Sequence, residues 1–207
     1  MNVVNGFAAK MGSPLRMHIR CLLMAALAIW PWPAVALDLT PRLGSGELEG
    51  IKIPLIEITD GTAKVSLQPP VGWQVTGGKT LLRFAPPTRG EIIVELRIHD
   101  LKALDQTTPE DLEKWCRKFL PSTCTQVALA RESASPFTLR GLPSHEYTYT
   151  YAFQAHGFTA SIAVIDLSPD QRLSLLVIAY PENFNSTHES AMRTMFSFDW
   201  NGRPDGQ

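Results

Sequence analysis

Histidine and acidic side chains are the groups in this chain best suited to acid–base or metal chemistry. Three histidines stand directly before an acidic residue, as His99-Asp100, His145-Glu146 and His188-Glu189. Adjacent strand residues point to opposite faces, so such a pair does not form one ligand set. The sequence contains no H-E-x-x-H motif, no zinc-type spacing of His and Cys, and no G-x-S-x-G motif. It therefore predicts no catalytic residue, no metal site and no cofactor.

Sites built from residues distant in sequence would escape such motifs, and paired carboxylates are the main example. Asp166 and Asp170 flank a turn, and we interpret them as solvated loop residues rather than as catalytic acids. We expect His188, in the first turn of the last predicted helix, to lie at the surface.

Cys116 and Cys124 are the cysteines that follow the N-terminal segment. In an oxidising compartment an even pair at this short spacing predicts a disulfide. Closing a loop of about nine residues would stabilise the fold by about 2.5 kcal/mol on the chain-entropy model. A redox-active pair is the functional alternative, but it lacks the C-x-x-C spacing. Two free buried thiols are the third alternative.

Tyr147, Tyr149 and Tyr151 occupy alternate positions, which is the pattern of a half-buried strand. Such a row of aromatic rings would suit a binding surface for a sugar or a peptide. The other interpretation is burial beneath a helix, which we favour because an open row of this size would be an unusual exposed patch.

These side chains must be positioned by a strand meander over residues 145–180. The alternation predicts two strands with a turn at His156-Gly157, then a second turn at Ser168-Pro169-Asp170 and an apolar central strand from Leu173 to Tyr180. A strand at 51–58, placed at an edge by Pro54, and a hairpin turn at Asp60-Gly61 precede it. Gly77-Gly78 is interpreted as a turn, because a phosphate-binding loop needs a strand–loop–helix context.

Two helices are predicted. Thr108 caps the first, Pro109 opens it, and Leu112, Trp115, Cys116 and Phe119 form one apolar stripe that ends before Pro121. Ser186 and Glu189 have the spacing of a capping box for the second helix.

Residues 1–36 have the pattern of an export signal, with a basic region, a short apolar run and a small-x-small cleavage site at Ala34-Val35-Ala36. Residues 1–15 resemble an upstream extension of it. We expect a flexible lead-in at 37–50, one α+β domain at 51–200 and a tail at 201–207. Removing three basic residues with the signal leaves 16 basic against 20 acidic side chains, a net charge of −4. This balance gives no reason to expect a nucleic-acid partner, and the mature chain is expected to have no transmembrane segment.

The order of elements carries a resemblance to a known family. It rests on the corner Pro70-Val71-Gly72-Trp73, on Gly141-Leu142-Pro143 before a long strand, and on the strand at 175–180 before Asn183-Phe184. Over residues 51–200 the chain resembles the PsbP-like family, which shares its α-β-α sandwich with a Ran-binding nuclear import factor. The resemblance implies a twisted antiparallel sheet with helices packed on its faces. The members of that family are mostly accessory or assembly proteins, and no site residue is carried over from them.

The sequence favours an exported, non-enzymatic accessory or binding protein of the bacterial envelope, with an envelope protein as the expected partner. The alternative is a small-ligand carrier or an enzyme, with a site between the sheet and the loops at Gly77-Gly78 and 86–88. Thiol chemistry at the two cysteines is a third, weaker hypothesis. The oligomeric state stays open.

Overall fold

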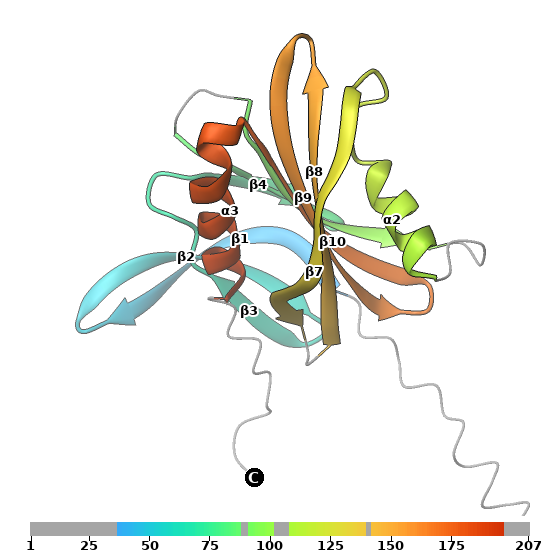
Figure 1. The fold of residues 1–207 in the computed structure, drawn as a ribbon. Helices are drawn as coiled ribbons and strands as arrows, with labels where there is room; N and C mark the ends of the chain where they lie inside the picture. Colours follow the sequence, from blue (N-terminus) through green and yellow to red (C-terminus); the bar gives the residue numbers. More distant parts are fainter. Residues whose placement is uncertain (1–36, 88–90, 102–107, 140–141, 197–207) are drawn as a thin grey trace, which may run out of the picture. The chain divides into compact units, whose positions relative to one another are not determined.

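The computed structural model describes residues 37–87, 91–101, 108–139 and 142–196, which all belong to one compact unit, Val35–Gln207. The predicted signal at 1–36 and the predicted tail at 201–207 lie outside the described residues. Within them the elements, shown in Figure 1, are β1 (Leu37–Leu48), β2 (Ile51–Asp60), β3 (Ala63–Leu67), β4 (Gln74–Gly78), β5 (Leu81–Ala85), β6 (Ile93–Asp100), α2 (Pro109–Arg117), β7 (Thr125–Leu139), β8 (Leu142–Phe153), β9 (His156–Ser168), β10 (Gln171–Ala179) and α3 (Pro181–Phe196).

The strands form two antiparallel sheets. The larger has the order β4-β5-β6-β10-β9-β8-β7, and the smaller has the order β1-β2-β3. With two helices in the described part of the chain, the α+β prediction is confirmed. Neither of these helices is long and apolar enough to cross a membrane.

The predicted meander is present as β8, β9 and β10, and it forms the middle of the larger sheet. Its second turn is where the sequence indicated, because β9 ends at Ser168 and β10 begins at Gln171. Its first turn is not at His156-Gly157 but two residues earlier, at Gln154 and Ala155, which have φ values of 49° and 66°. Two successive positive φ values are typical of a tight turn that matches the strand twist. The prediction from His156-Gly157 therefore places the turn too late in the sequence.

The larger sheet is covered on both faces, which explains the apolar composition of β10. On one face Leu176 and Ile178 join the tyrosine row and pack with residues of α2. On the other face Leu175 and Val177 pack with α3 and with the smaller sheet. The two helices thus lie on opposite faces of the larger sheet (Figure 1).

Helix α2 forms as its sequence predicts. The Thr108 side chain accepts a hydrogen bond from the Asp111 backbone N–H at 3.2 Å, which satisfies an otherwise unpaired donor of the first turn. The helix ends at Arg117, and tighter turns with i to i−3 hydrogen bonds continue as far as Leu120. The apolar stripe faces the sheet.

The lead-in predicted at 37–50 is wrong, since residues 37–48 form β1. Leu37 and Leu39 are buried in the core, and the strand pairs with β2 along most of its length. Gly44 and Gly46 suit this pairing, because the side chains of Glu57 and Leu55 occupy the space that a Cβ at these positions would need. The glycines that suggested flexibility thus permit close packing within a sheet.

Strand β2 lies in the middle of its sheet rather than at the edge that Pro54 indicated. The pairing of β3 with β2 covers only Ile56–Asp60, so Pro54 lies where β2 is paired on one side alone. A missing N–H is tolerated at such a place.

Helix α3 begins five residues earlier than the predicted capping box. Pro181 occupies the start, where its missing N–H needs no partner. The Ser186 hydroxyl donates to the carbonyl of Asn183 inside the helix, so Ser186 is not a cap. Ala191, Met192 and Met195 are buried against the sheet.

Candidate functional site: a pocket beneath helix α2

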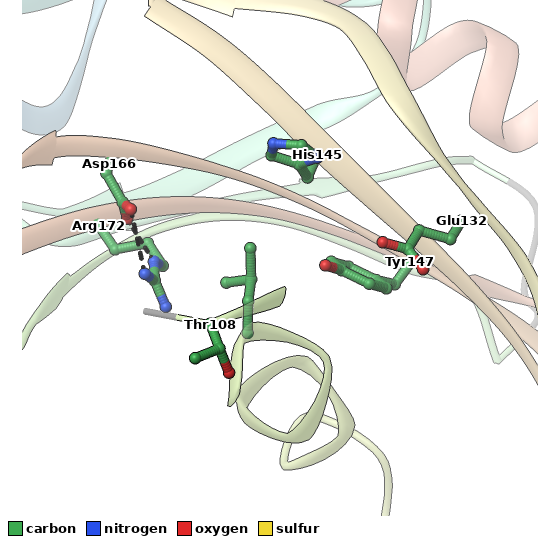
Figure 2. Close-up of a pocket in the computed structure, with 7 residues that line it drawn as sticks. Thr108, Glu132, His145, Tyr147, Asp166 and Arg172 are labelled. Atoms are coloured by element: carbon green, nitrogen blue, oxygen red, sulfur yellow. Dashed lines mark hydrogen bonds and ion pairs between the residues drawn. The ribbon is translucent and has the colours of Figure 1, made fainter. Parts of the chain in front are cut away.

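A pocket of about 250 Å³ lies between α2 and the sheet (Figure 2). Its walls come from α2 and from four neighbouring strands, β7 to β10. Strand pairing brings the sheet residues together, since Glu132 lies opposite Tyr147 and Arg172 lies opposite Asp166. The lining residues are Thr108, Leu112, Glu132, His145, Tyr147, Asp166 and Arg172.

Arg172 is the most unusual residue of the pocket, because its side chain is only 1% exposed. Its Nε donates to Asp166 Oδ1 at 2.5 Å and its Nη2 donates to Asp166 Oδ2 at 3.2 Å. The guanidinium carbon lies 4.8 Å from the centroid of the Trp115 ring, in cation–π geometry. Nη1 has no hydrogen-bond partner in the described structure. In Figure 2 this nitrogen points away from Asp166, on the side where Thr108 lies.

An unpartnered buried donor is costly, about 1 to 3 kcal/mol and more for a charged group. Most buried polar groups in native proteins are satisfied, so an exception has to be explained. The position of Arg172 in the wall of a pocket suggests that a bound group supplies the missing acceptor.

The opposite side of the pocket is acidic. Burial raises the pKa of the Tyr147 hydroxyl to about 12, and the nearby Glu132 carboxylate adds to this rise and accepts a hydrogen bond from it. Tyr147 therefore stays protonated at neutral pH.

Aromatic rings pack beside Arg172, outside the lining of the pocket. His99 packs edge-on against Trp115 and Phe119, with ring centroids 4.9 Å and 5.3 Å away, and its Nε2 lies 2.8 Å from Ser174 Oγ. Burial, assisted by Arg97 and Arg172, lowers the pKa of His99 to about 4. His99 is therefore neutral at physiological pH and adds no charge beside Arg172.

A second polar cluster lies on the opposite face of the sheet, under α3. His188 Nε2 lies 2.6 Å from Glu146 Oε1, and the Ser161 hydroxyl donates to the same oxygen. Burial favours a raised pKa for Glu146, but the hydrogen bonds from His188 and Ser161 outweigh it and hold this pKa below its usual value. A serine hydrolase needs its histidine between the serine and the carboxylate, whereas here the carboxylate is central. The cluster therefore attaches α3 to the sheet and activates no nucleophile.

His188 is one correction to the sequence analysis, since it is 25% exposed and bonded to a buried carboxylate. Because α3 begins at Pro181, His188 falls in its second turn and faces the sheet. Asp166 is another correction, because it pairs with Arg172 instead of being only a solvated loop residue.

The tyrosine row is covered. Tyr147, Tyr149 and Tyr151 are 1%, 1% and 5% exposed beneath α2, so they do not form an open surface. The Tyr149 hydroxyl donates to the carbonyl of Glu113 on α2 at 3.2 Å. Of the three, Tyr147 alone lines the pocket.

The predicted disulfide is not formed, since Cys116 and Cys124 are both free. Cys116 is fully buried in the tyrosine cluster, whereas Cys124 follows a turn in which its N–H bonds to the carbonyl of Pro121. Spacing along the chain sets the length of a loop, but a disulfide also requires the two Cβ atoms to approach and to point toward each other. Burial raises the pKa of the Cys116 thiol to about 12, which also removes the basis for thiol chemistry there.

Of the loops that the sequence indicated, the described residues Gly77, Gly78, Pro86 and Pro87 are not in the lining of this pocket. Gly77 and Gly78 belong to β4 and pair with Leu82 and Leu81. Among the described residues no group of three or more His, Cys, Asp or Glu side chains is placed to hold a metal ion.

One signal in the sequence pointed toward the pocket. Arg172 is a lone basic residue within the apolar strand β10, and a cation inside a covered strand needs a partner. Asp166, across the turn, is the nearest acidic candidate on the preceding strand. Nothing in the sequence indicated that Glu132 and His145 would join them.

Neither a family model nor a curated protein sequence matches this chain. Solved structures are similar to it at low identity. Cyanobacterial PsbP (CyanoP) from Synechocystis has a TM-score of 0.47 and 15% identity, covering 75% of this chain and 96% of that one. The Ran-binding protein Mog1p of Saccharomyces cerevisiae has a TM-score of 0.42 and 11% identity, covering 76% and 92%. LpqN of Mycobacterium tuberculosis, involved in cell envelope biogenesis, has a TM-score of 0.40 and 17% identity, covering 64% and 80%.

PsbP and the Ran-binding Mog1p, the two kinds of protein named in the sequence resemblance, are both among these structures, and the similarity is one of structure alone. At these TM-scores and identities it extends to no ligand, partner or role.

Proposed function

We propose that this protein is an exported, non-enzymatic accessory protein that binds a small polar ligand in the pocket beneath α2. The observation that carries the proposal is the buried guanidinium of Arg172, which lines the pocket with one nitrogen unpartnered. A ligand acceptor at this nitrogen would relieve the cost of the unsatisfied donor. Export is supported by the signal pattern of residues 1–36. An α-β-α sandwich of the PsbP-like kind is supported by the presence of one helix on each face of the larger sheet.

Binding is favoured over catalysis by the state of the hydroxyl groups in the pocket. A nucleophilic hydroxyl needs a base within hydrogen-bond reach and a lowered pKa or an equivalent activation. The Thr108 hydroxyl is occupied by its cap and by the Asp111 carboxylate, and the pKa of Tyr147 is raised. Neither of these two hydroxyls, from Thr108 and Tyr147, is therefore poised for attack.

The test is NMR of the labelled protein against a library of small acids, amines, amides and sugars. We expect saturable shifts confined to residues of the pocket, and we expect Arg172→Met to abolish them. Arg193→Met, an exposed arginine of α3, is the matched control and should leave them unchanged. A library that shifts no pocket resonance, or shifts that persist in Arg172→Met, would refute the proposed site.

Export has its own test, which is N-terminal sequencing of the protein recovered from the envelope fraction. We expect the chain to begin at Leu37, after the small-x-small site. An uncleaved chain found only in the cytoplasmic fraction would refute export and leave the pocket unaffected.

A further inference from the structure

The charges of the pocket define the ligand more closely. Arg172 and Asp166 already form an ion pair, so this end is close to neutral and needs an acceptor without much charge of its own. A carboxylate or phosphate on the ligand would bring a second negative charge beside Asp166. The unpartnered Nη1 is therefore better matched by a neutral carbonyl oxygen.

The other end carries Glu132, and among the described residues Arg172, which is already paired, is the one lysine or arginine that lines the pocket. Figure 2 shows the two ends on opposite sides, with Arg172 and Asp166 at one and Glu132 and Tyr147 at the other. His99, beside Arg172, is neutral at physiological pH. Among the described lining residues the acidic side chains are Asp166, which is paired with Arg172, and Glu132, so the excess of acidic over basic groups lies at the Glu132 end.

From this arrangement we infer that the pocket binds a monocation that carries a neutral carbonyl, such as an amino amide or the N-terminal residue of a peptide. The carbonyl accepts from Arg172 Nη1, and the ammonium donates to Glu132. The inference rests on the proposed function and names the class of ligand for the same pocket.

The volume of the pocket agrees with a ligand as small as one amino amide. About 250 Å³ is below the range of drug-sized sites, which begins at about 300 Å³. Leu112 and the buried Tyr147 ring add apolar contact to the lining of the pocket. One aminoacyl unit, or a short chain with an ammonium and an amide at its ends, is accordingly preferred to a larger molecule.

The experiment is an NMR titration of the full chain with probes that differ by one group. Alaninamide and 4-aminobutanamide carry the ammonium and the carbonyl at two spacings. Alanine replaces the amide by a carboxylate, N-acetylalaninamide lacks the cation, and ethylamine lacks the carbonyl. We expect one of the two amino amides to bind at least three-fold more tightly than each of these three, and to bind more weakly as salt is raised.

Glu132→Gln keeps the shape of the side chain and removes its charge. It should weaken binding of the amino amide three- to ten-fold and leave N-acetylalaninamide unchanged. Glu189→Gln, on the exposed part of α3, is the matched control and should change nothing. Alanyl-alanyl-alaninamide, a longer probe, distinguishes a peptide N-terminus from a free small amine as the ligand. Binding as tight as that of alaninamide indicates a peptide N-terminus, and exclusion indicates a free small amine.

Tighter binding of alanine, of another anion or of a sugar than of both amino amides would overturn the class of ligand and leave the proposed binding function standing. An unchanged affinity in Glu132→Gln would overturn it as well. If no probe and no library compound shifts a pocket resonance, the proposed function fails and the inference fails with it.

Discussion

Removing the Asp166 carboxylate should destabilise the protein strongly, because Arg172 would then be a buried cation without its counter-charge. Arg172 is 1% exposed, and the hydrogen bonds that its side chain makes both go to Asp166. Breaking a buried ion pair by removing one partner costs about 3 to 5 kcal/mol. Asp166 is 49% exposed, so water can approach its side of the pair and screen part of the interaction. We therefore expect a loss near the lower limit, about 3 kcal/mol, for Asp166→Ala.

The assay is equilibrium unfolding in urea, with the slope of the transition checked to be unchanged. For a domain of this size about 3 kcal/mol corresponds to a fall in Tm of about 6 to 12 °C. Asp170→Ala is the matched control, since this exposed acid lies in the same turn and receives a bond from Ser168 rather than from Arg172. We expect it to change the stability by no more than about 0.5 kcal/mol.

A double variant distinguishes an uncompensated charge from a general loss of packing. Replacing a buried ion pair by apolar side chains of similar volume is often neutral or stabilising. Asp166→Ala combined with Arg172→Met should therefore recover most of the stability lost in Asp166→Ala alone. If Asp166→Ala costs less than the Asp170→Ala control, or if Arg172→Met deepens the loss, the reasoning about the buried pair is refuted.

Three further predictions concern other parts of the fold. Because the pKa of Glu146 is lowered in the folded state, its contribution to stability is present above its unfolded pKa of about 4.3 and is lost as the pH falls through its folded value. Glu146→Gln should cost about 1 to 3 kcal/mol at pH 7 and flatten the acid limb of a Tm-against-pH curve, whereas a parallel acid limb would contradict this. Cys116, with its pKa raised to about 12, should resist alkylation at pH 8 until guanidinium unfolds the chain, and rapid labelling of the native protein by mass spectrometry would show that it is accessible. Thr108→Ala should lose about 1 kcal/mol in urea unfolding through its cap on α2, and an unchanged midpoint would show that the cap contributes nothing.

The elements that the sequence predicted well are those whose determinants are local. The first helix has its cap, its opening proline and its apolar stripe within twelve residues, and it forms as α2. Alternation of side chains along β8 follows from the geometry of a single strand, so the sequence alone indicates that the tyrosines share one face. Burial of that row followed from the size of the apolar surface it would otherwise expose.

The errors have non-local causes. The glycines and charges of residues 37–48 form no apolar pattern and therefore predict a flexible lead-in. Pairing with β2 nevertheless supplies the backbone hydrogen bonds that make this segment strand β1. The spacing of Ser186 and Glu189 predicts a helix start near Ser186, whereas the helix α3 begins at Pro181. Cys116 and Cys124 have the spacing of a disulfide, but the direction of each side chain is set by the helix and by the turn that hold them.

By itself the sequence determined the class of the fold, the meander at its centre and the face of β8 that turns inward, because hydrophobic periodicity and turn residues act over a few positions. The pocket was decided by tertiary structure alone. Glu132, Asp166 and Arg172 lie on three different strands, and strand order and register place them around one space beneath α2. Those long-range contacts decide whether a charged side chain is paired and which of its nitrogens has no partner. The local sequence pattern does not determine them.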